Sequence, residues 1–347
     1  MGILFLTGGL QTTVQDGGRA GYQQYGVSAA GATDWRSFVI ANHLVSNDEN
    51  EAALEVSLLG PSIVFERNAT IAITGGNLSP AIDGAPVPMY RTVRAFAGAK
   101  LTFGVPVTGC RSYIAFSGGL DINPVMGSRS TFIKGSLGGH QGRALNKGDR
   151  IGFRNPGALI VGYEDRFVEP DDFSGDEFAA RVIMGPQDDA FTDAGIAAFL
   201  SGAYAVTNES DRMGIRLQGD AIEHKAGGDI ISDAIAFGAI QVPSHGQPII
   251  MLADRQTTGG YTKIAAVASV DFSVIAQLTP GKRVRFKAID VAEAQALYLR
   301  GLEHLRATRA RLDAQTSAAL ARLPPERRFG VTVNGDARYD VTVQEIR

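Results

Sequence analysis

The sequence contains little of what several protein classes depend on. It has a single cysteine, Cys110, which excludes an internal disulfide framework and indicates a reducing compartment. No apolar stretch approaches the roughly 20 residues of a membrane-spanning helix, and the apolar run in the opening segment MGILFLTGG is too short for a signal peptide. The formal net charge of −3 suggests neither a nucleic-acid groove nor a patch for acidic membranes. We therefore expect a cytoplasmic protein that binds neither nucleic acid nor membranes.

Familiar catalytic signatures are also absent from the sequence. The five histidines are scattered, and none has the spacing of a zinc site. The sequence has neither a G-x-x-x-x-G-K-[ST] phosphate loop nor a G-x-S-x-G nucleophile elbow. Among the histidines, His140 is the best functional candidate because it lies between Gly139 and Gln141, whereas a structural role is expected for His43. The sequence therefore predicts no metal site.

Glycine and short apolar segments, in contrast, are abundant. The chain has 42 glycines among 347 residues, and its apolar segments are short and alternating or continuous, which is typical of strands and turns. The acidic stretch YEDRFVEPDDFSGDE, residues 163–177, interrupts this pattern. The order of segments before it recurs after it, since QPIIMLADRQTTGG corresponds to RSYIAFSGGLD and PGKRVRF to KGDRIGF. We therefore predict two similar β-rich domains, residues 1–165 and 166–289.

Two helices and a hairpin are predicted outside these strands. Asp34 is a suitable N-cap for a helix from residue 35 to about 45. From residue 290 to about 314, apolar residues recur near helical spacing and predict an amphipathic helix. The C-terminal segment FGVTVNGDARYDVTVQEIR contains two alternating strands around an Asn-Gly turn. Residues 290–347 are therefore predicted as a helix and β-hairpin extension.

The stretch MLADRQTTGGYTKIA, residues 251–265, is the strongest candidate for a binding site. An apolar run leads to Asp254 and Arg255, and polar residues and two glycines follow. Glycines let a ligand or another backbone come close, because they have no Cβ atom. A hairpin turn explains the same pattern equally simply. Asp254 accordingly is either a general base or a structural partner of a neighbouring group.

Similar polar groups follow other predicted strands, and each is flanked by glycine. If the two domains face one another, these strand ends meet in one cleft, where a ligand site is common. The predicted catalytic residues are Arg129, His140, Arg212 and Asp254. The predicted substrate-binding residues are Arg19, Tyr22, Arg143, Gln256, Thr257, Thr258, Gly259, Gly260 and Tyr261.

Ten ordered motifs carry a family resemblance. The strings are VQDGGRAGY, GVSAAGATD, LLGP, FSGGLD, GSRSTF, GGHQGRAL, GPQ, SDRMGIRL, IQVP and QTTGGY. In this order they resemble the biotin-dependent carboxyltransferase family, which includes allophanate hydrolase subunit 2, the C subunit of 5-oxoprolinase and KipA-like proteins. The resemblance covers about residues 13–286 and implies a mainly β fold with two cyclophilin-like β-barrel domains in tandem. Ala30, where the family commonly has glycine, and His245, where an acidic residue is frequent, depart from the pattern and loosen any inference about the substrate.

The resemblance implies a function but leaves alternatives open. The main one is the C subunit of an ATP-dependent 5-oxoprolinase, which opens the lactam of 5-oxoproline to L-glutamate with ATP as co-substrate of the complex. Its partners would be a smaller cyclophilin-like subunit and a barrel subunit, and its substrate a small-molecule amide. The alternatives are a carboxyltransferase subunit that moves carboxyl from carboxybiotin to urea or a related amide, and a non-catalytic regulatory protein that antagonises a kinase inhibitor. The chain shows no biotin-acceptor segment, so we expect no biotin attached to it.

Opening a lactam requires positive charge and hydrogen-bond donors around a carbonyl that gains negative charge. Arginine suits this task because its guanidinium binds carboxylate or phosphate through two parallel bonds. Four of the predicted site residues are arginines: Arg19, Arg129, Arg143 and Arg212. The structural alternative is that these arginines tie the two domains together through Asp16, Asp34 and Asp211.

Overall fold

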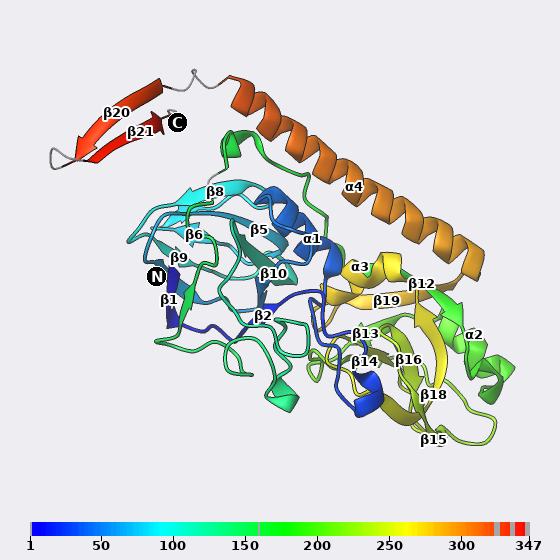
Figure 1. Ribbon diagram of the computed structural model, residues 1–347. Coiled ribbons are helices and arrows are strands. Elements are labelled where there is room, and N and C mark those ends of the chain that lie inside the picture. Colours follow the sequence, from blue (N-terminus) through cyan, green and yellow to red (C-terminus); the bar gives the residue numbers. More distant parts are fainter. Residues whose placement is uncertain (1, 159, 323–326, 334–336, 344–347) are drawn as a thin grey trace.

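The computed structural model describes residues 2–158, 160–322, 327–333 and 337–343 (Figure 1). The fold is mainly β with few helices, as predicted. The first half forms two sheets, with strand orders β11-β1-β4-β9-β6-β7 and β2-β3-β10-β5-β8. The strands are β1 (Gly2–Thr7), β2 (Gln11–Gln15), β3 (Ala53–Ser57), β4 (Ser62–Phe65), β5 (Ala69–Asn77), β6 (Ala81–Ile82), β7 (Ala85–Pro86), β8 (Thr92–Ala95), β9 (Lys100–Thr102), β10 (Thr108–Phe116) and β11 (Arg150–Gly152).

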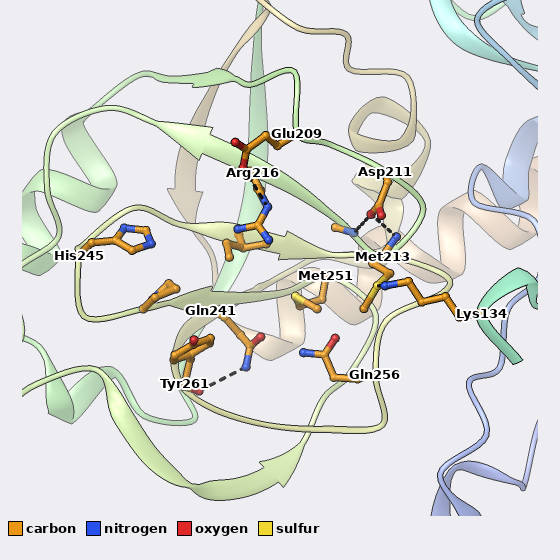
Figure 2. A pocket seen from close by; sticks show the side chains of 13 residues that line it. Lys134, Glu209, Asp211, Met213, Arg216, Gln241, His245, Met251, Gln256 and Tyr261 are labelled. Carbon is orange, nitrogen blue, oxygen red and sulfur yellow. Dashed lines mark hydrogen bonds and ion pairs between the residues drawn. The ribbon is translucent and has the colours of Figure 1, made fainter. Parts of the chain in front are cut away.

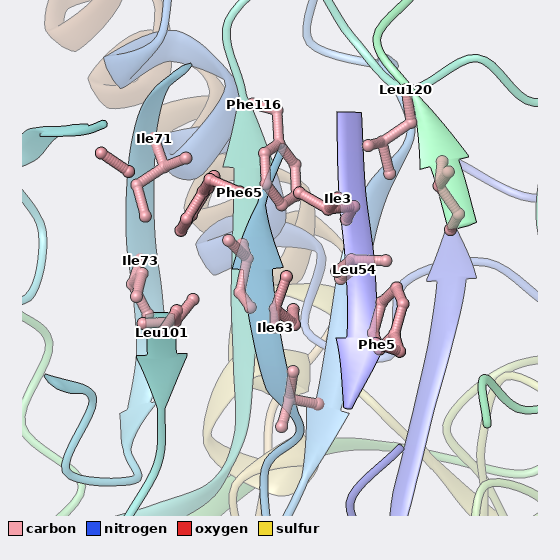
Figure 3. Packing of buried hydrophobic residues seen from close by; sticks show 14 of the residues in the cluster. Ile3, Phe5, Leu54, Ile63, Phe65, Ile71, Ile73, Leu101, Phe116 and Leu120 are labelled. Carbon is pink, nitrogen blue, oxygen red and sulfur yellow. The ribbon is translucent and has the colours of Figure 1, made fainter. Parts of the chain in front are cut away.

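Both sheets of the first half bury side chains in one core. Alternate residues of a strand point to the same face, so Ile3 and Phe5 of β1 lie together, as do Ile71 and Ile73 of β5 (Figure 3). Leu54 of β3 packs into the same cluster from the second sheet. Each Å² of apolar surface removed from water stabilises the folded state by about 25 cal/mol. Separating the two sheets would expose this shared core to water, so the core holds them together as one unit.

The predicted helix near residue 35 is confirmed as α1 (Trp35–Leu44). Asp34 caps it: its carboxylate accepts hydrogen bonds from the Ser37 amide at 3.1 Å and the Ser37 hydroxyl at 2.7 Å. The apolar residues of α1 are buried against β5 and β10, on the side of that sheet opposite the first core. The helix therefore closes one face of the first half.

The second half is a closed barrel, in which β12 pairs with β19 on one side and with β18 on the other. The order around the barrel is β12-β19-β13-β14-β17-β16-β18, and β15 extends outward from β18. The strands are β12 (Glu177–Met184), β13 (Tyr204–Val206), β14 (Gly214–Gln218), β15 (Asp229–Ala234), β16 (Ala239–Val242), β17 (Ile249–Met251), β18 (Thr258–Val267) and β19 (Arg283–Ala288). Two helices, α2 (Asp193–Ser201) and α3 (Phe272–Ala276), lie beside it. The predicted domain boundary between residues 165 and 166 stays a prediction. The acidic stretch 163–177 contributes no residue to the core between the two sheets of the first half or to the core inside the barrel.

The C-terminal helix α4 (Val291–Ala321) is longer than the sequence pattern predicts, because it continues past residue 314. It runs beside both halves and packs against α1 (Figure 1). The buried guanidinium of Arg166 links the two helices, since it donates to the Leu44 carbonyl at 2.7 Å and to the Leu312 carbonyl at 2.6 Å.

The predicted C-terminal hairpin is confirmed in its strands. β20 (Arg327–Val333) pairs antiparallel with β21 (Ala337–Val343), and the Asn334-Gly335 turn lies outside the described residues.

Across the described part of the chain, no helix is both long and apolar enough to cross a membrane. The short 3-10 helices are η1 (Gln23–Tyr25), η2 (Ile133–Gly135), η3 (Tyr163–Asp165), η4 (Asp188–Ala190) and η5 (Ser269–Asp271).

Candidate functional site

A groove of about 540 Å³ lies on the outer face of the barrel (Figure 2). Successive residues of a strand point to opposite faces, which explains how β14 contributes to the groove. Ile215 and Leu217 point into the barrel core, whereas Gly214 and Arg216 line the groove. Lys134 reaches the groove from the first half of the chain. Its lining consists of Lys134, Glu209, Asp211, Met213, Gly214, Arg216, Gln241, Pro243, His245, Ile249, Met251, Gln256 and Tyr261.

Two carboxamides face this groove from neighbouring elements. Gln241 of β16 is 1% exposed, and its Nε2 donates to the Tyr261 carbonyl at 3.5 Å. Gln256 lies just before β18 and is exposed. A Cβ atom at Gly259 would lie 3.1 Å from the Gln241 Nε2 and 3.3 Å from the Gln256 Nε2. Glycine at this position therefore gives both carboxamides room.

The glycines of the QTTGGY motif belong to a strand and not to a hairpin turn. Gly259 lies within β18, where it pairs with Asp233 of β15, and Tyr261 of the same strand pairs with Asp229. The turn alternative is therefore wrong for these glycines. The physical reason is the added strand β15, which gives this end of β18 a hydrogen-bonding partner.

Charged groups surround the carboxamides. Arg216 Nε lies 3.6 Å from Glu209 Oε2, and the Asp211 carboxylate accepts from the Met213 amide at 2.7 Å. Lys134 is exposed, and its Nζ approaches the Met213 sulfur. It takes part in none of the ion pairs formed among the described residues. The groove thus combines two carboxamides and two carboxylates, those of Glu209 and Asp211, with an ammonium group that forms no ion pair among the described residues.

Arg212 and Asp254 lie apart from this groove, at the junction of the two halves. Arg212 binds Asp254 through Nε at 3.0 Å and Nη2 at 2.9 Å. Its remaining donors bind the Gly31 carbonyl, the Thr33 hydroxyl and the Glu55 carboxylate. Burial lowers the pKa of Arg212, but Asp254 and Glu55 outweigh this effect and raise it. Because all five N–H donors are used, this geometry supports the structural alternative, a tie between the halves that runs through Glu55 in place of Asp211.

A second hydrogen-bonded tie lies beside it. The Gln277 side chain accepts from the Cys110 and Arg111 amides, each at 2.9 Å, and donates to Asp34 Oδ2 at 2.8 Å. Cys110 itself is buried, as expected, and burial raises the pKa of its thiol. The two halves therefore meet across a polar junction whose main groups are hydrogen-bonded.

Arg19 and Arg129 stabilise loops in the first half. Arg19 is fully buried and donates to the Val125 and Ser130 carbonyls at 3.0 and 2.9 Å. The Arg129 amide donates to Asp16 Oδ2 at 2.6 Å. Asp16 also accepts from the hydroxyls of Ser128 and Ser130, each at 2.6 Å. These bonds hold the glycine-rich loop after β2 against residues 122–131. Burial lowers the pKa of Arg19, although nearby carboxylates partly offset this effect.

His140 and Arg143 form a third cluster with Asp149. Arg143 binds both carboxylate oxygens of Asp149, at 2.6 and 2.8 Å, and His140 Nε2 lies 3.4 Å from Asp149 Oδ1. The bonds from Arg143 lower the pKa of Asp149 to about 2. Tyr22 is half-buried beside Arg19. None of these residues lines the groove, so the residues predicted to share one cleft are divided between three clusters and the groove itself.

The groove contains only Gln256 and Tyr261 from the predicted site; Thr257 and Thr258 lead into β18 beside them. Sequence reasoning missed Lys134, Arg216 and Gln241. Gln241 had a detectable signal, since it is a polar residue inside the apolar segment AIQV. The sequence signal for Lys134 was weaker: it is the single basic residue of the segment FIKGS.

Comparison with known proteins is consistent across sequence and structure. The profile of the carboxyltransferase domain, subdomain A and B, matches residues 25–288. The C subunit of 5-oxoprolinase from Escherichia coli is 37% identical over 295 residues, which cover 84% of this chain and 93% of that protein. Urea amidolyase of Saccharomyces cerevisiae is 32% identical over 312 residues, covering 83% of this chain but 17% of that protein. The crystal structure of K. lactis urea amidolyase, 29% identical, matches 88% of this chain and 20% of that one with a TM-score of 0.81.

Proposed function

Because this chain belongs to the family of carboxyltransferase domains, subdomain A and B, we propose that it acts as the C subunit of a 5-oxoprolinase, an enzyme complex that opens the lactam of 5-oxoproline to L-glutamate. Its similarity to the two bacterial proteins of that name, along nearly their whole length, supports this choice. The observation that carries the proposal is the groove in which Lys134, an ammonium group that forms no ion pair among the described residues, accompanies two carboxamides, Gln241 and Gln256.

The chemistry of the groove matches the chemistry of 5-oxoproline. This substrate has one carboxylate, one lactam N–H and one lactam carbonyl. An ammonium group binds the carboxylate, and a carboxamide offers both a donor and an acceptor. The Gln241 Nε2 is engaged by the Tyr261 carbonyl, so its Oε1 is the atom available to accept from the lactam N–H. The Gln256 amide then donates to the lactam carbonyl.

The reaction needs activation, because an amide carbonyl is a weak electrophile. ATP, as co-substrate of the complex, would supply that activation at the carbonyl oxygen. The residues of this chain contribute orientation: Lys134 binds the carboxylate, and the Gln256 side chain donates toward the oxygen that gains negative charge. In this proposal the partner subunits supply the nucleotide site, and this chain acts without biotin attached to it.

Carboxyl transfer from carboxybiotin to urea is the second candidate, and the similarity to urea amidolyases favours it. Urea, however, is neutral and has no carboxylate for Lys134 to bind. An ammonium group beside two carboxamides therefore suits an amide that bears an acid better than it suits urea.

Reconstitution tests the proposal. The chain is co-expressed with a smaller cyclophilin-like subunit and a barrel subunit, and the purified complex is assayed for glutamate formation from 5-oxoproline and ATP. We expect turnover by the complex and none by this chain alone. Urea-dependent consumption of carboxybiotin without glutamate formation would support the second candidate instead. Full-rate hydrolysis by the isolated chain would contradict the assignment as a dependent subunit.

A further inference from the structure

A second cavity, of about 440 Å³, lies where three parts of the chain meet. The loop before α1, the barrel segment around α3, and α4 each contribute to its walls. α4 packs against both α1 and η5, which places the helix over the junction (Figure 1). The cavity shares no lining residue with the groove on the barrel. It is therefore a separate space and not an extension of the proposed substrate site.

The walls of this cavity are largely apolar and rich in aromatic rings. Four aromatic side chains line it: Trp35, Phe237, Phe272 and Tyr298. Leu302 and Leu305 of α4 complete the wall on the helix side. A volume of this size lies within the ~300–1,000 Å³ usual for small-molecule pockets. Flat apolar groups pack well between such rings.

The charged residues that line this cavity are all basic. Two arginines, Arg36 and Arg255, line the cavity, and none of its lining residues is acidic. Arg36 pairs with Asp171, which lies outside the lining, at 3.1 Å. Arg255 is 8% exposed and forms no ion pair within the described part of the chain. Among the described residues, its N–H groups donate to two backbone carbonyls, those of Ile235 at 2.9 Å and Leu252 at 3.2 Å.

Burying a charged group without a counterion is costly, and an opposite charge offsets that cost. Burial alone accounts for the lowered pKa of Arg255, since no carboxylate acts on it. The Arg255 guanidinium also lies 5.8 Å from the centre of the Phe237 ring, so the cation and the aromatic wall face the same space.

We propose that this cavity binds a small organic anion with a flat apolar body, such as an aromatic carboxylate. The anionic group pairs with the Arg255 guanidinium, and the ring system packs among the four aromatic side chains. The occupant touches both halves and α4 at once. Its binding therefore stabilises the folded chain by mass action.

Two isosteric probes test the charge requirement: 2-naphthoate and the neutral 2-naphthamide. Calorimetric titration of the full chain is expected to show at least ten-fold tighter binding of the carboxylate, and the carboxylate is expected to raise the melting temperature. Equal affinities for the two probes would overturn the anion assignment. Failure of both probes to bind at millimolar concentration would overturn the site itself.

A filling variant tests the location. Gly301 lines the cavity from the middle of α4, and a Cβ atom there meets no heavy atom within 4 Å. Gly301→Phe should therefore fold, fill the cavity and lower naphthoate affinity more than ten-fold. Ala307→Phe, on an exposed part of the same helix, is the matched control and should bind as the parent does. Unchanged binding in Gly301→Phe would place the probe elsewhere and refute the proposal.

A charge variant tests the role of the arginine. Arg255→Gln should bring the affinities for naphthoate and naphthamide to within about three-fold of each other. The affinity for naphthoate should fall, and the affinity for naphthamide should stay close to that of the parent. Retained discrimination in a folded Arg255→Gln protein would show that another group recognises the anion. If this variant unfolds, the filling variant and the probe pair still decide the question.

Discussion

The guanidinium of Arg212 pairs with the carboxylate of Glu55 across the junction of the two halves, and their side chains are only 4% and 1% exposed. Asp254 binds the opposite edge of the same guanidinium. The Arg111 Nε lies 3.9 Å from the same Glu55 carboxylate, so two cations and two carboxylates share a space with little access to water.

Arg212→Met is expected to lower the free energy of unfolding by about 3–5 kcal/mol. It leaves the buried Asp254 without an ion-pair partner among the described residues, and it leaves Glu55 with only the more distant Arg111. Denaturant titration measures the change. Arg150→Met is the control: Arg150 is exposed and pairs with Glu66 at the surface, so its loss should cost at most about 1 kcal/mol. Equal losses in both variants would show that the buried ion pairs of Arg212 have no special weight.

Lys134→Met in the reconstituted complex is expected to raise KM for 5-oxoproline about 10–100-fold while kcat changes little, since a charge-assisted hydrogen bond contributes about 1.5–3 kcal/mol. Steady-state kinetics measure both parameters. Lys134→Arg should recover most of the affinity, and Lys147→Met, at another exposed position, should behave like the parent. A matching loss in Lys147→Met would indicate a general charge effect and not a site.

Gly138→Ala is expected to destabilise the loop that holds Arg19. Gly138 has φ of +65°, and a Cβ atom there would lie 2.1 Å from the Ser130 carbonyl oxygen and 2.6 Å from Arg19 Nη2. Gly127→Ala is matched in backbone conformation, with φ of +78°, but its Cβ meets nothing within 4 Å. It should cost about 1–2 kcal/mol of backbone strain alone, and Gly138→Ala clearly more, by thermal or chemical unfolding. Similar costs would mean that the clash is relieved by loop movement.

Stability should fall as the pH drops from about 6.5 toward 4, and His43 should cause part of this fall. Burial, reinforced by the charges of Arg309 and Arg166, lowers the pKa of His43 to about 4 from the ordinary 6.5. In this window the unfolded chain binds a proton that the folded chain does not, so protonation favours unfolding. The effect by pH 4 is about 3 kcal/mol, since one pKa unit corresponds to about 1.4 kcal/mol. Unfolding of His43→Gln followed from pH 7 to 4 should show a smaller slope, and an unchanged slope would exclude this histidine.

Features that depend on neighbouring residues could be predicted from the sequence. Asp34 before an apolar repeat predicted α1, helical spacing after residue 290 predicted α4, and alternation predicted the C-terminal strands. The end of α4 was missed because residues 315–321 continue the helix with weak amphipathic spacing. These features follow from capping and periodicity, which act over a few residues.

The grouping of polar side chains into sites, in contrast, depends on tertiary contacts. Arg212 is a strong candidate for anion binding in the sequence, yet Glu55, 157 positions away, and Thr33 use the donors that a ligand would need. Lys134 and Gln241 are far apart in the chain, but a loop of the first half and a strand of the barrel bring them to one groove. Local spacing cannot encode such distances, because they depend on how the two halves pack and on which strand β18 pairs with.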